Sequence, residues 1–130
     1  MDHNRIKAKE WFKKAEHDFD VINDILKGSR HPDVAGVLLQ QGTEKYLKGY
    51  LIDKGWKLVK THDLKQLLDE AVKHNPKFNA YYDLLDMITG YYFEEKYPFG
   101  ETEVTLEEIK ENLKVIKDLI DLIEKDFERG

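Results

Sequence analysis

Apolar residues recur at spacings of three and four along almost the whole chain, which is the period of an α-helix. The first such segment ends at Gly28, and Pro32 is well placed for the first turn of a second helix that runs to about Ile52. A third helix is expected to begin at Asp63, whose side chain can cap it, and to end before Pro76. The first part of the chain is therefore predicted to be three helices joined by loops.

Two further helices are predicted in the rest of the chain. One covers residues 78–92, and the last starts at Thr105, which forms a capping box with Glu108, and keeps an unbroken apolar seam from Leu106 to Phe127. No strand pattern or internal repeat competes with these helices. The sequence thus predicts an all-α, up-and-down bundle of about five helices in a single domain covering residues 1–130. The long seam and the aromatic residues also predict a homodimer.

The chain has no cysteine and a formal net charge of -5, with acidic and basic side chains interspersed. The absence of cysteine excludes disulfides, thiolate zinc sites and a cysteine nucleophile. The charge pattern shows no broad basic surface, so DNA is not expected as a partner. No apolar run approaches the roughly 20 residues of a membrane span, and no export signal is visible, so a cytoplasmic protein without membrane contact is expected.

The polar residues of the second helix gather on one side of it. An arc of roughly 140° contains Gln40, Gln41, Glu44, Lys45 and Lys48. Such a strip is an ordinary solvated face if its members only pair with each other at i, i+4. It is a binding site if Lys45 and Lys48 present two ammonium groups to an anion such as a nucleotide phosphate, with Gln41 and Glu44 adding directional hydrogen bonds. The pattern alone leaves both interpretations open.

Two further segments carry candidate polar residues. Thr61-His62-Asp63 opens the third helix, where backbone N–H groups and the helix dipole favour an anion, although this motif is equally a structural cap. If the second and third helices pack antiparallel, His62 is expected to pair with Lys48. Lys96-Tyr97-Pro98 is either a turn that fixes an aromatic plug or part of a ligand site.

Several familiar chemistries have no counterpart in the chain. It contains no Glu-x-x-His pair for a di-iron bundle, no His-Glu-x-x-His for zinc and no glycine-rich phosphate loop. Ser29 is the sole serine and lies outside any nucleophile-elbow context. Metal, redox and serine-nucleophile chemistry are therefore not expected.

Motifs at four places share the order and spacing of one known family. They are Trp11-Phe12 with Ala15 and Asp18-Phe19, the set Gln41, Glu44, Lys45 and Lys48, the run Thr61-His62-Asp63-Leu64, and Lys96-Tyr97-Pro98. This combination resembles the HEPN family of small helical domains, in which Arg-Tyr-Pro is usual at the last place. The resemblance implies a four- or five-helix bundle that forms homodimers, is often encoded beside or fused to a small nucleotidyltransferase, and in some members binds nucleotides.

Many HEPN proteins are ribonucleases that use an arginine followed four to six residues later by a histidine. No histidine follows Arg5, Arg30 or Arg129 at that distance. The resemblance therefore implies a nucleotide-binding, non-catalytic HEPN domain that acts with a nucleotidyltransferase-type partner in a toxin–antitoxin-like or nucleotide-related system. Two alternatives stay open: a degenerate ribonuclease toxin that uses His62 and a lysine, and a purely structural dimerisation module. With no catalytic residue, metal or cofactor expected, the expected ligand-binding residues are Gln41, Glu44, Lys45, Lys48, Thr61, His62, Asp63, Lys96 and Tyr97.

Overall fold

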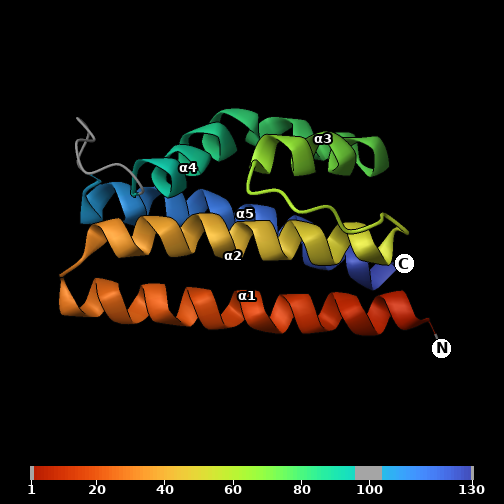
Figure 1. Cartoon of the computed structure of the whole chain (residues 1–130), viewed down its shortest axis with the longest axis horizontal. Helices are drawn as coiled ribbons and strands as arrows, with labels where there is room; N and C mark the ends of the chain where they lie inside the picture. The colour runs from red at the N-terminus through yellow and green to blue at the C-terminus, as the bar shows by residue number, and fades with distance from the viewer. Residues whose placement is uncertain (1, 96–103, 130) are drawn as a thin grey trace.

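The computed structural model describes residues 2–95 and 104–129, and these residues are almost entirely helical (Figure 1). They form α1 (His3–Gly28), α2 (Pro32–Asp53), α3 (Leu64–His74), the 3₁₀ helix η1 (Pro76–Tyr81), α4 (Tyr82–Glu95) and α5 (Leu106–Arg129). No strand occurs in the described ranges, and the prediction of an all-α fold with about five helices is confirmed. Within the same ranges, no helix is long and apolar enough to cross a membrane.

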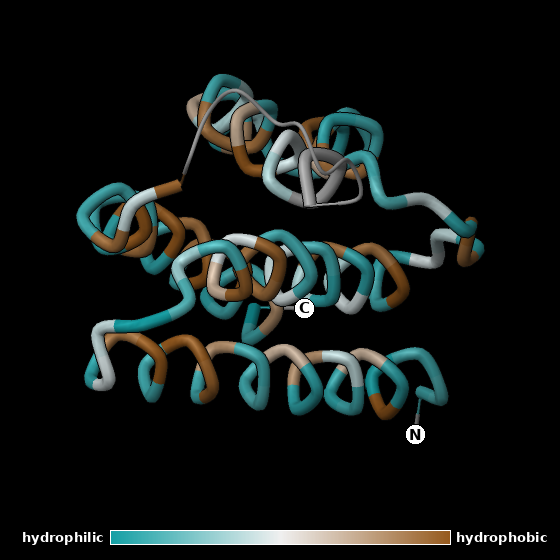
Figure 2. Tube along the Cα trace, turned by 60° about the vertical axis from the view of Figure 1, so that its left-hand side comes forward, coloured by the Kyte–Doolittle hydropathy of each residue, from teal (hydrophilic) through white to brown (hydrophobic). Residues whose placement is uncertain are grey.

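Helix α2 lies in the middle of the bundle, with α1 on one side, α3 and α4 on the other, and α5 behind it (Figure 1, Figure 2). Near its C-terminal end α5 also contacts α1, where the rings of Phe127 and Phe12 are 5.0 Å apart. Its apolar residues are spread around the helix, and Leu39, Leu47, Tyr50 and Leu51 are all completely buried. A helix that is apolar on most sides must be covered from several directions. This arrangement also draws most of the polar strip of α2 into the interior of the protein.

Two glycines let α1 approach α2 closely. A Cβ atom on Gly49 would lie 2.8 Å from Cε1 of Phe12 and 3.0 Å from the carbonyl oxygen of Ala8. A Cβ atom on Gly42 would lie 2.7 Å from Cε2 of Phe19. Because a side chain at either position would overlap α1, these glycines set the spacing of the most extensive helix pair among the described residues.

Helix α3 runs parallel to α2, since the loop between them turns back along α2 (Figure 1). The start of α3 lies beside Gln40, whose side chain donates a hydrogen bond to the carbonyl oxygen of His62 at 2.8 Å. Its other end lies near the C-terminal part of α2, where the rings of His74 and Tyr50 are 6.4 Å apart. The antiparallel packing assumed for the pairing of Lys48 with His62 is therefore wrong, because the loop is long enough to run back beside α2.

The fourth predicted helix is divided into two elements. Its first part is the 3₁₀ helix η1, in which Asn75 accepts a hydrogen bond from the backbone N–H of Lys77 at 3.0 Å. This tight first turn places Phe78 completely inside the core. The α-helix starts only at Tyr82, so the predicted start at residue 78 is too early.

The apolar seam of α5 is buried within one chain. The buried members of the seam are Ile109, Leu113, Ile116, Ile123 and Phe127. Leu119 is buried beside them, whereas Ile120 is half-buried, and α2 is the main helix that α5 contacts. The seam belongs to the core of a single chain, and it does not supply the surface from which a homodimer was predicted. The homodimer stays a prediction.

Candidate functional site

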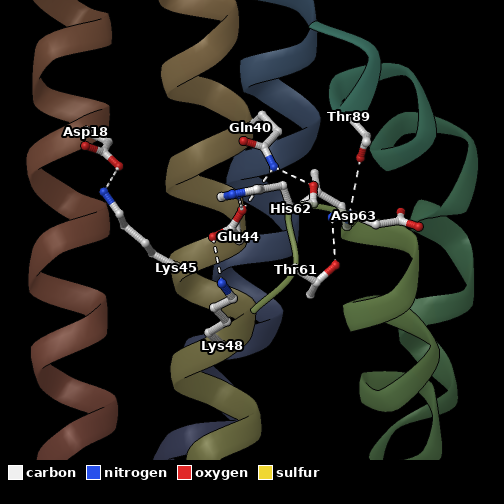
Figure 3. A network of polar contacts seen from close by, with 10 residues as sticks. Asp18, Gln40, Glu44, Lys45, Lys48, Thr61, His62, Asp63 and Thr89 are labelled. Atoms are coloured by element: carbon white, nitrogen blue, oxygen red, sulfur yellow. Dashed lines mark hydrogen bonds and ion pairs between the residues drawn. The ribbon is translucent and has the colours of Figure 1, made fainter. Parts of the chain in front are cut away.

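The carboxylate of Glu44 lies at the centre of a buried polar network on α2 (Figure 3). Its Oε2 accepts a hydrogen bond from Nζ of Lys48, one turn along the helix, at 2.8 Å. Its Oε1 faces Nδ1 of His62 at 3.0 Å. The side chains of Glu44 and Lys48 are 9% and 7% exposed, whereas that of His62 is 53% exposed. The network is thus closed to solvent at Lys48 and open to solvent at His62.

The side-chain amide of Gln40 ties this network to the loop before α3. Gln40 is completely buried, and its Nε2 donates to Oε1 of Glu44 at 3.2 Å and to the carbonyl oxygen of His62 at 2.8 Å. Its own Oε1 has no hydrogen-bond partner among the described residues. The second of these hydrogen bonds holds the backbone at His62 against α2. Gln40 was not among the expected ligand-binding residues, and its place in the polar strip was the only signal for it.

The backbone N–H groups at the start of α3 are used inside the protein. Thr61 Oγ1 accepts from the N–H of Asp63 at 3.1 Å, and Asp63 Oδ1 accepts from the N–H of Lys65 at 3.0 Å. Thr89 Oγ1, from α4, accepts from the N–H of Leu64 at 3.3 Å. Thr61 and Asp63 therefore cap the helix, and an anion at these N–H groups would have to displace one of the three acceptors.

Lys45 points away from Glu44 and toward α1 (Figure 3). Its Nζ lies 2.7 Å from Oδ2 of Asp18, and the two side chains are 25% and 9% exposed. Lys45 and Lys48 therefore each face a carboxylate of the protein. Of these two lysines, Lys48 is the one that the structure brings to the same carboxylate as His62.

The remaining expected residues lie away from this network or beyond the described ranges. Gln41 is half-buried on α2, and Lys96 and Tyr97 lie outside the residues that the structure describes. Within those described residues, no group of three or more His, Asp or Glu side chains is placed to hold a metal ion.

Lys48 also connects the network with a groove that the sequence motifs did not indicate. Its Nζ lies 5.8 Å from the ring centroid of Trp11. Trp11 and Trp56 both line this groove, together with Lys7 and Lys57. A signal for it was present in the sequence, because basic residues gather in the first half of the first helix and again in the loop after the second helix.

The fold and the site define a small all-α domain whose central helix carries a buried Glu–Lys pair facing a Thr-His-Asp helix start. The sequence profile of the HEPN domain matches residues 8–126. The chain therefore belongs to the HEPN domain family, and the resemblance found in its motifs is confirmed. No curated protein and no solved structure gives a significant match to this chain.

Proposed function

We propose that this HEPN domain binds a nucleotide, does not cleave RNA, and acts with a nucleotidyltransferase-type partner in a toxin–antitoxin-like or nucleotide-related system. The observation that carries the proposal is the convergence of Lys48 and His62, from two different elements, on the carboxylate of Glu44. A buried lysine and a half-exposed histidine held by one carboxylate place two groups that can bind phosphate in defined positions.

A phosphate group can reach this arrangement from the exposed side of His62. Glu44 is fixed on α2 and stays paired with Lys48, so the phosphate would be an added partner of His62 beside this ion pair. Lys48 would keep Glu44 as its negatively charged partner in the interior. Gln41, Lys45, Thr61, Asp63, Lys96 and Tyr97 enter the proposed site from the family motif alone.

The environment of Arg5 supports the non-catalytic part of the proposal. Its Nη1 lies 3.3 Å from both carboxylate oxygens of Asp53, and its Nη2 donates to the carbonyl oxygen of Phe127 at 2.8 Å. Its guanidinium carbon also lies 3.9 Å from the centroid of the Phe127 ring. A guanidinium engaged in this way joins α1 to the ends of α2 and α5 and is not free to bind RNA phosphate.

The nucleotidyltransferase-type partner and the homodimer enter the proposal through the family resemblance. Light scattering at micromolar concentration tests the homodimer. A mass twice that of one chain supports it, and a monomer mass removes it.

Nucleotide binding is tested by calorimetry and thermal unfolding with a panel of nucleotides. The variant Glu44→Gln/Lys48→Gln removes both buried charges together, so that neither is left alone in the interior. The matched control is Glu70→Gln/Lys73→Gln, which removes the same two residue types from the exposed face of α3. A nucleotide at about 100 times its dissociation constant raises the free energy of unfolding by roughly 2.7 kcal/mol.

The proposed function is supported if a nucleotide raises the free energy of unfolding of wild type and of Glu70→Gln/Lys73→Gln but not that of Glu44→Gln/Lys48→Gln. No gain with any nucleotide, in wild type, overturns it and leaves the structural dimerisation module as the better interpretation.

One observation favours a degenerate ribonuclease as a second candidate. A carboxylate against Nδ1 of a histidine, as between Glu44 and His62, is the arrangement that orients a general base in several hydrolases. A fluorescent single-stranded RNA decides between the two functions. Cleavage that disappears in His62→Ala would establish the ribonuclease, and intact RNA with both proteins supports the non-catalytic function.

A further inference from the structure

Both tryptophans of the chain line one groove, which lies between the first half of α1 and the loop after α2. The groove has a volume of about 460 Å³, which falls among the usual sizes of small-molecule sites. Trp11 and Trp56 are half-buried, and Leu58 in the same groove is 54% exposed. The groove therefore offers flat aromatic and apolar surface to a ligand.

Two lysines stand at this groove, one from each of its walls. Lys7 comes from α1 and Lys57 from the loop, and both side chains are exposed. Neither lysine forms an ion pair with a carboxylate of the described residues. Asn4 adds a side-chain amide to the same surface. The polar part of the groove is therefore cationic.

Charge is segregated along α1, although the chain as a whole has a net charge of -5. The first half of the helix carries Arg5, Lys7, Lys9, Lys13 and Lys14 against the single acid Glu10, and the second half carries Glu16, Asp18, Asp20 and Asp24 against the single base Lys27. The loop after α2 adds Lys54, Lys57 and Lys60 and no acid before Asp63. Charge is therefore uneven within α1, and the two walls of the groove carry Lys7 and Lys57, which attract anions.

Aromatic surface and ammonium groups together select an aromatic anion. An indole face stacks on a planar base whatever the base is, and lysine binds phosphate as a point charge. An apolar ligand would leave Lys7 and Lys57 unused, and inorganic phosphate would leave Trp11 and Trp56 unused. A nucleoside phosphate carries both required groups in one molecule.

The geometry points to a nucleotide site in this groove, with the base against Trp11 and Trp56 and the phosphate on Lys7 and Lys57. This inference rests on the proposed function, because it keeps a nucleotide as the ligand. It differs from that function in placing the phosphate on Lys7 and Lys57 instead of beside His62. Lys48 lies 5.8 Å from the ring centroid of Trp11, so the groove borders the Glu44 network.

Intrinsic fluorescence reports on the groove directly, because the chain has two tryptophans and both line it. We expect saturable quenching by AMP, GMP, CMP or UMP, weaker quenching by the matching nucleoside and none by inorganic phosphate. Lys7→Ala/Lys57→Ala should weaken nucleotide binding by about tenfold or more, as loss of charge-assisted contacts does. Lys13→Ala/Lys14→Ala is the control, since it removes two exposed lysines from α1 outside the groove.

Calorimetry with the same nucleotides distinguishes an error about the groove as the nucleotide site from an error about nucleotide binding itself. Binding that Lys7→Ala/Lys57→Ala leaves unchanged overturns the groove and leaves the proposed function standing. No binding to the wild-type protein overturns both. Equal weakening of nucleotide binding in the two double variants would show an effect of net charge and overturn the nucleotide site in the groove. Tighter binding of an acidic, phenylalanine-containing peptide than of any nucleotide would overturn it as well.

Discussion

The imidazole of His62 meets the carboxylate of Glu44, with 3.0 Å between Nδ1 and Oε1, and joins the end of a loop to the buried middle of α2. The carboxylate has a second partner in Lys48, whose ammonium group is almost fully enclosed. Glu44 is therefore the residue on which both the buried charge and the position of the loop depend.

Glu44→Leu should destabilise the protein strongly. The change leaves the ammonium group of Lys48 buried without its carboxylate, which costs about 3–5 kcal/mol in the free energy of unfolding. Urea denaturation measures this loss. Glu44→Leu/Lys48→Met should recover most of it, because no lone charge remains.

The control for Glu44 is Glu70→Leu on the exposed face of α3. Glu70 also pairs with a lysine, but that lysine is 67% exposed, so the change should cost less than about 1 kcal/mol. Similar losses in the free energy of unfolding for Glu44→Leu and Glu70→Leu would contradict the view that the buried Lys48 depends on the carboxylate of Glu44.

Gly49→Ala should weaken the contact between α1 and α2. The new methyl group would lie 2.8 Å from Phe12 and 3.0 Å from the backbone of Ala8, and overpacking of this kind costs about 1–3 kcal/mol. Gly90→Ala in α4 is the matched control, because nothing lies within 4 Å of its added Cβ. There the better helix propensity of alanine should raise the free energy of unfolding by up to about 1 kcal/mol. If Gly49→Ala and Gly90→Ala changed the free energy of unfolding in the same direction, the close approach of α1 to α2 at Gly49 would be refuted.

Protonation of Asp126 should make the protein less stable in acid. Burial alone raises the pKa of Asp126, but hydrogen bonds from Tyr50 and Asn75, with nearby Lys54 and Arg129, outweigh it and hold the pKa below its usual value. A carboxyl group with a lowered pKa in the folded state stabilises the fold above its unfolded pKa of about 3.9. That contribution is lost as the pH falls from there through the folded pKa.

Urea denaturation between pH 5 and pH 2 measures the effect of Asp126. The free energy of unfolding should fall less steeply in Asp126→Asn than in wild type. Asp86→Asn, at an exposed position of α4, should follow the wild-type curve. Parallel curves for Asp126→Asn and wild type would exclude this role of Asp126.

The ionised carboxylate of Glu124 should lower the stability of the protein at neutral pH, whereas that of Asp126 raises it. Its pKa is raised, first by burial and then by the neighbouring charges of Asp121, Glu16 and Glu128. The folded state therefore holds this proton more tightly than the unfolded state does, and ionised Glu124 lowers stability at neutral pH. Glu124→Gln should raise the free energy of unfolding at pH 7 by up to about 0.5 kcal/mol.

The gain from Glu124→Gln should shrink in high salt and below pH ~4, where the unfolded chain is also protonated. The control is Glu10→Gln, because Glu10 lies among the lysines of the first half of α1. An equal gain from both changes would rule out repulsion within the acidic cluster as the cause.

The helices were predictable because their boundaries depend on local hydrogen bonds and backbone limits. Asp63 caps the N–H of Lys65, and Thr105 accepts from the N–H of Glu108 at 3.1 Å. Each of these contacts joins residues two or three apart, so it is visible in a short piece of sequence. The end of α1 was also predicted correctly, although the residue that takes the left-handed conformation is Ser29, with φ 53°, and not the preceding glycine.

The contacts between helices were decided by the tertiary structure. Helix periodicity determines that Glu44 and Lys48 are neighbours, but the contact of His62 with Glu44 depends on a loop that returns along α2. The same motif fits an antiparallel or a parallel α3, because both directions bury the same apolar face. Local hydrogen bonds specify a helix within a few residues, whereas helix direction and the Trp11–Trp56 groove follow from many weak packing contacts summed over the whole chain.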